Sequence, residues 1–72
     1  MKIPSNIVLP ARSQIAGQEL RRELDISRMT LNNWTHKHHF PKPARMIGVR
    51  AFYNTVEIAT WLRERGCSVR IV

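Results

Sequence analysis

The sequence has a single cysteine, Cys67, so no disulfide bond can form within the chain. A lone cysteine is typical of proteins that work in a reducing cytoplasm. No apolar run approaches the roughly eighteen residues of a membrane span. The apolar N-terminus is too short for a signal peptide and is interrupted by Pro4 and Pro10. We therefore expect a soluble, cytoplasmic protein that has no membrane partner.

Acidic side chains are scarce, with five Asp and Glu against twelve Lys and Arg, which gives a formal net charge of +7. Such an excess repels itself unless the partner is a polyanion. Nine of the twelve cations are arginines, whose planar fork matches phosphate groups and the guanine edge. The composition favours a nucleic-acid partner over the alternative of an inert cationic surface.

Catalytic groupings are missing from the sequence. It has no carboxylate pair, no nucleophile with its base and no glycine-rich phosphate loop, and its 72 residues leave little room for a deep cleft. The run HKHH places His36, His38 and His39 far from Cys67, which does not reproduce the spaced ligand pairs of a zinc site. We therefore expect a protein that is not an enzyme and has neither a cofactor nor a metal.

The first helix is predicted from residue 17 onward. Residues 1–14 hold two prolines and no helical periodicity, so we expect an N-terminal arm with a short extended piece at residues 7–9. In GQELRREL, Leu20 and Leu24 lie four apart with charged residues between them. This spacing predicts a short amphipathic helix whose apolar stripe faces inward.

A second helix is predicted over residues 28–36. Ser27 is a good N-cap, and no proline or glycine follows it as far as Phe40. Leu31 and Trp34 share one face, with Ile26 placed to pack beneath them, and the opposite face is polar. Two helices joined by a short turn, the second with a polar outer face, form the outline of a helix-turn-helix.

A β-hairpin is predicted after the second helix. Pro41 and Pro43 end the helix and favour extended backbone. Residues 44–47 and 49–53 indicate two strands that turn near Gly48, where a positive φ is expected. Basic side chains are spread along this segment: Lys42, Arg45 and Arg50.

A third helix follows the hairpin. Asn54 and Glu57 form a capping pattern, and Gly66 closes the helix. Its apolar stripe consists of Ile58, Trp61 and Leu62. The tail, residues 67–72, alternates, and a strand, an arm or a disordered end are all open. The predicted fold class is mainly α with a small β-hairpin, a winged helix-turn-helix over residues 15–66 between an arm and a tail.

Two segments of the chain, LDISRMTLNNW and FPKPARMIGVRAFYNTVEIATWLRERG, resemble a known family. They are similar to the excisionases and AlpA-type regulators of phages and mobile elements, which are related to the MerR DNA-binding domain. The residues that match the family pattern are Ser27, Arg28, Thr30, Leu31 and Trp34, then Phe40, Pro41, Pro43, Gly48 and Tyr53, then Glu57, Ile58, Trp61 and Leu62. One position departs from the pattern: Val49 follows the wing glycine where arginine is common, and Arg50 comes one residue later.

The resemblance implies a protein that binds double-stranded DNA in a bacterial host cell. An excisionase, or recombination directionality factor, binds and bends attachment-site DNA and steers an integrase toward excision. An AlpA-like transcription regulator, which binds an operator, is the alternative within the family. The implied partners are duplex DNA, an integrase and further copies of the chain on adjacent sites. Outside the family, a protein-only interaction module that presents its basic face to an acidic partner stays open.

The expected DNA contacts lie on the second helix and on the wing. An asparagine side chain both donates and accepts, which suits adenine, whereas arginine suits guanine or phosphate. Ser27 is equally placed to act only as a cap, and Thr30 is equally placed to be half-buried against the first helix. Arg21 and Arg22 are expected on solvated faces, with a phosphate clamp as the alternative for either. The candidate helix residues are Ser27, Arg28, Met29, Thr30, Asn32, Asn33 and His36, and the candidate wing residues are Lys42, Arg45 and Arg50.

Overall fold

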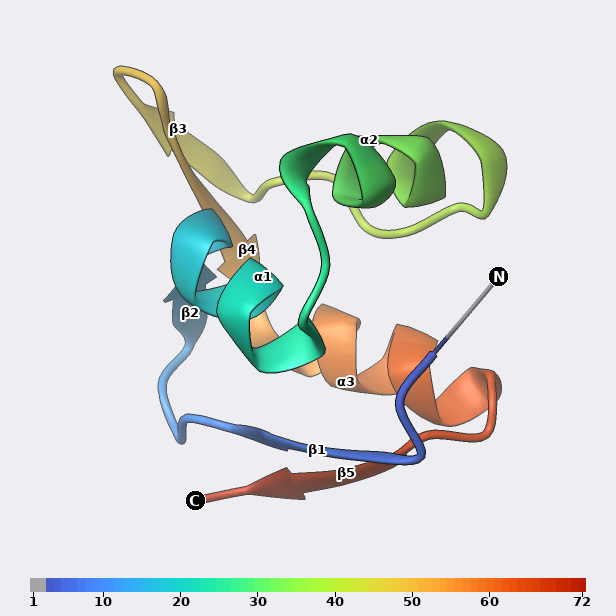
Figure 1. Cartoon of the computed structure of the whole chain (residues 1–72). Helices are drawn as coiled ribbons and strands as arrows, with labels where there is room; N and C mark the ends of the chain where they lie inside the picture. Colours follow the sequence, from blue (N-terminus) through green and yellow to red (C-terminus); the bar gives the residue numbers. More distant parts are fainter. Residues whose placement is uncertain (1–2) are drawn as a thin grey trace.

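The computed structural model describes residues 3–72 and shows a mixed α/β fold with three helices and two small sheets in that range (Figure 1). The elements in chain order are β1 (Asn6–Leu9), β2 (Gln14–Ala16), α1 (Gly17–Leu24), α2 (Arg28–Lys37), β3 (Arg45–Ile47), β4 (Arg50–Asn54), α3 (Thr55–Glu64) and β5 (Ser68–Ile71). The chain is therefore richer in strands than the mainly α fold that was expected. Within residues 3–72, no helix is both long enough and apolar enough to cross a membrane.

The three predicted helices are confirmed, and each begins or ends where the local chemistry requires. Ser27 Oγ accepts a hydrogen bond from the Thr30 backbone N–H at 3.1 Å and so caps α2. Asn54 Oδ1 caps α3 in the same way through the Glu57 N–H at 3.1 Å. Asp25, in the left-handed region at φ 55°, ends α1 and starts the short turn into α2. These local bonds fix where α2 begins relative to α1.

The predicted hairpin is confirmed: β3 and β4 pair antiparallel. They belong to a three-stranded sheet with the strand order β2-β4-β3. Ile47 faces Arg50 across a two-residue turn, and Gly48 adopts the expected positive φ of 60°. The hairpin projects from the body of the molecule (Figure 1). The third strand of this sheet, β2, lies where no strand was expected, and it buries Ile15 completely against β4.

The two ends of the chain differ from the expected arm and open tail. The short extended piece at residues 7–9 is confirmed, but it belongs to β1, which pairs in parallel with β5. Ile7 and Leu9 point into the core, and Leu9 is fully buried. The strand is thus the alternative that holds for the tail. A small domain needs this extra apolar area to cover α1 and α3, which its helices alone cannot supply.

An aromatic cluster joins α2, the following loop, β4 and α3. Trp34 stacks on Trp61 with ring centroids 5.4 Å apart, and Phe40 meets Trp61 edge-on at 4.8 Å. Phe40 also meets Tyr53 of β4 edge-on at 5.9 Å. All four rings are buried, so each helps to set the position of α2 relative to the sheet that carries the hairpin.

Replacement of Leu9 tests whether β1 is part of the core. Leu9→Ala should lower the free energy of unfolding by about 2–5 kcal/mol, because it leaves a cavity under a fully buried side chain. The control Val8→Ala, in the same strand but 44% exposed, should cost about 1 kcal/mol or less. Urea unfolding followed by tryptophan fluorescence measures both. Equal losses in the two variants would show that β1 is a dispensable arm.

Candidate nucleic-acid interface

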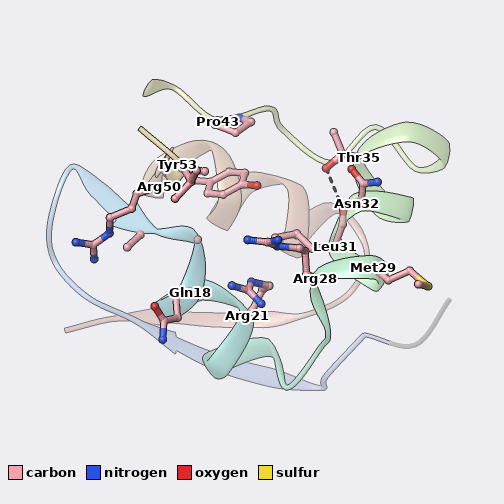
Figure 2. A pocket seen from close by; sticks show the side chains of 14 residues that line it. Gln18, Arg21, Arg28, Met29, Leu31, Asn32, Thr35, Pro43, Arg50 and Tyr53 are labelled. Atoms are coloured by element: carbon pink, nitrogen blue, oxygen red, sulfur yellow. Dashed lines mark hydrogen bonds between the residues drawn. The ribbon is translucent and has the colours of Figure 1, made fainter. Parts of the chain in front are cut away.

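A groove of about 740 Å³ lies between α1, the first half of α2 and the hairpin (Figure 2). Each of its walls comes from a different part of the chain. The lining residues are Ala16, Gly17, Gln18 and Arg21 near α1, Arg28, Met29, Leu31, Asn32 and Thr35 on α2, and Pro43, Val49, Arg50, Ala51 and Tyr53 on the hairpin side.

The charge in the groove is of one sign. Arg21, Arg28 and Arg50 come from three different elements, and no carboxylate lines the groove. Among the described residues, the salt bridge that forms joins Arg12 to Glu19 at 2.7 Å and involves none of these arginines. Figure 2 shows the guanidinium groups of Arg21 and Arg28 pointing into the groove. The groove therefore suits an anionic ligand.

Tyr53 forms the floor of the groove between the two walls. Its side chain is only 6% exposed, and its ring is held by Phe40. Burial raises the pKa of Tyr53 above the ordinary 10.0, and the positive charge of Arg21 partly opposes that rise. Arg21 and the phenol are thus electrostatically coupled inside the groove.

The candidate residues of α2 divide into two sets. Arg28, Met29 and Asn32 line the groove, and Met29 is 76% exposed. Ser27 caps α2, and its hydroxyl also lies 3.1 Å from that of Thr30, which is half-buried. Two further candidates, Asn33 and His36, are exposed and lie outside the groove lining.

The basic residues near the hairpin are not equivalent. The guanidinium carbons of Arg45 and Arg50 lie 5.8 and 5.9 Å from the centroid of the Phe52 ring, which holds them on one face of the sheet. Arg50 also borders the groove, although its guanidinium points away from that of Arg28 (Figure 2). Lys42 was expected on the hairpin. It lies instead in the connection between α2 and β3.

Gln18, Arg21 and Tyr53 are among the groove residues that were absent from the candidate set. Arg21 was expected on a solvated face, with a phosphate clamp as the alternative, because the helical spacing of α1 predicts its inward leucines but not what faces Arg21. Tyr53 was noticed only as part of the family pattern. Its closeness to Arg21 depends on the packing of β4 against α1, which no local sequence signal reports.

The histidine run takes part in the fold through its backbone. The His38 carbonyl accepts hydrogen bonds from Trp61 Nε1 at 3.0 Å and from the Arg65 guanidinium at 2.7 Å. The same guanidinium lies over the Trp61 ring, 4.1 Å from its centroid. Over residues 3–72, no cluster of three or more His, Cys, Asp or Glu side chains could hold a metal ion.

Comparisons with protein-family models, with curated proteins and with solved structures found no match to this chain.

Alkaline titration of Tyr53, the only tyrosine in the chain, tests the coupling across the groove. Arg21→Gln should raise the Tyr53 pKa further, because it removes the charge that favours the phenolate. Arg22→Gln, on the exposed side of the same helix, is the control and should leave this pKa unchanged. Tyrosinate absorbance follows both, and equal values in the two variants would contradict the coupling.

The same ionisation affects stability at high pH. The pKa of Tyr53 is higher in the folded chain than in the unfolded chain. The protonated phenol therefore contributes its full share to the free energy of unfolding below about pH 10, and this contribution is lost as the pH rises through the folded-state pKa. The titration should therefore be combined with circular dichroism, so that the Tyr53 pKa is taken only from the range in which the chain is folded.

Proposed function

We propose that this chain is a non-catalytic, sequence-specific DNA-binding protein with a winged helix-turn-helix fold. The observation that carries the proposal is the groove between α2 and the hairpin, which three arginines line and no carboxylate enters. DNA is the ligand class that combines a continuous negative charge with the length to span α2 and a projecting hairpin.

In this proposal α2 enters the major groove, which is about 12 Å wide and admits a helix. One strand of the sugar-phosphate backbone of the DNA then passes through the protein groove, beside Arg21 and Arg28. The hairpin serves as the wing and reaches the adjacent minor groove, with Arg45 and Arg50 near the phosphates. Asn32 is the base-reading residue, because of the two asparagines on α2 it is the one that lines the protein groove.

Within this proposal, the resemblance noted in the sequence favours an excisionase that acts on attachment-site DNA in the bacterial cytoplasm. An AlpA-like regulator that binds an operator would use the same interface and is the second candidate. Footprinting separates the two: directly repeated sites beside an integrase gene would support the excisionase. A palindrome that overlaps a promoter would support the regulator.

The salt dependence of DNA binding tests the groove. Arg21→Gln and Arg28→Gln should each weaken binding to every duplex and reduce the slope of log K against log salt by about 0.9, the value for one phosphate contact. Arg22→Gln carries the same charge change outside the groove lining and should leave the slope nearly intact. Fluorescence anisotropy across a salt series gives the slopes. A wild-type chain that binds no duplex would instead favour the protein-only module.

The two adjacent asparagines provide a matched test of base reading. Asn32→Ala should reduce the preference for the specific site over random DNA by about 1–3 kcal/mol, while non-specific binding persists. Asn33→Ala, just outside the groove lining, should preserve the preference. Competition binding between selected and random duplexes measures the ratio. A uniform loss on all sequences in Asn32→Ala would assign this side chain to the phosphates.

A further inference from the structure

The tip of the hairpin is apolar and exposed. Met46 is 57% exposed, Ile47 52% and Val49 89%, so none of them contributes much to the core. Apolar side chains gathered at a projecting point, with basic residues around them, are typical of a contact surface. These side chains stay exposed in the folded chain, so the tip is free to contact a partner.

The position of Val49 identifies that partner. Val49 belongs to the lining of the same groove as Arg21 and Arg28, so a ligand that fills the groove meets the tip as well. At the base of the tip, Arg45 and Arg50 lie close to the Phe52 ring and add two positive charges. A protein partner with an apolar surface would have to desolvate those charges, whereas a duplex would neutralise them.

The turn at the tip of the hairpin is short. Only Gly48 and Val49 connect the strands, and the antiparallel register runs up to the pair Ile47 and Arg50. The positive φ of the turn is at Gly48, and the φ of Val49 is not positive. Ile47 and Val49, on either side of Gly48, therefore lie together at the end of the hairpin.

We propose that Ile47 and Val49 form an apolar wedge that enters the DNA minor groove and partly unstacks one base step. This inference rests on the proposed DNA binding and deepens it, because it assigns the bending that the family resemblance implies to two apolar side chains of the hairpin tip. Apolar side chains inserted in this way kink a duplex by roughly 20–90° toward the major groove. The specificity that results comes from the deformability of the step, which is greatest at pyrimidine–purine steps.

The experiment uses a duplex that the wild-type chain selects from random DNA, with 2-aminopurine placed at successive positions and a fluorophore pair at its ends. The wild-type chain should raise 2-aminopurine fluorescence at one step and shorten the end-to-end distance. Val49→Ser should abolish most of both signals, while weakening affinity by only about tenfold, since the arginine contacts remain. A one-nucleotide gap at that step should restore most of the lost affinity, because the kink then costs little.

Two variants serve as controls. Val56→Ser replaces a 67% exposed valine on α3, outside the groove lining, and should behave as wild type. Val49→Arg should strengthen the salt dependence but still lose the 2-aminopurine signal, because a charged side chain stays hydrated and does not unstack bases. A fluorescence signal that persists in both Val49 variants would overturn the wedge.

The remaining outcomes are also decisive. If Val49→Ser leaves the bend unchanged but removes cooperativity on two adjacent sites, the tip contacts a second copy of the chain and the wedge is wrong. A wild-type chain that selects no duplex would overturn the proposed DNA binding itself. A chain that binds its site with the expected salt slope, yet bends it equally with and without Val49, overturns the wedge alone.

Discussion

The buried contact of Phe40 with Trp61 and Tyr53 is the interaction on which the candidate site depends. Phe40 lies in the loop between α2 and the hairpin, and its ring meets Trp61 at 4.8 Å and Tyr53 at 5.9 Å. Trp34 completes the cluster by stacking on Trp61 at 5.4 Å. Because α2 and β4 pack on one cluster, that cluster sets the separation of the two walls of the groove. Loss of this packing would separate the two walls without altering either one.

The groove also gathers part of the positive charge of the molecule. Twelve basic residues against five acidic ones leave seven net positive charges on 72 residues, and this excess disfavours the compact state. The fold nevertheless gathers Arg21 and Arg28 around a buried phenol instead of spreading them apart. No carboxylate lies beside these charges in the groove, so an anion that enters would neutralise them. The proposed DNA binding would supply that anion.

The two small sheets divide the work between stability and contact. The β1–β5 pair closes the underside of the domain, where Leu9 is fully buried beneath the helices (Figure 1). The β2-β4-β3 sheet buries Ile15 and Tyr53 at one end, and at the other its β3–β4 hairpin extends away from the core and carries Val49, which is 89% exposed, at the tip. A domain this small can support an exposed hairpin because the pairing of its two ends supplies the core area that the hairpin does not.

The sequence by itself determined the features whose causes are local. Ser27 and Asn54 cap the helices that they were expected to cap, and Gly48 turns the hairpin with a positive φ, because each depends on neighbours a few residues away. Only the tertiary structure decided that β1 pairs with β5 and that Arg21 faces Tyr53. Those pairings join segments that are distant along the chain, and a strand or a helix shows in its own pattern which face is apolar but not which partner covers it.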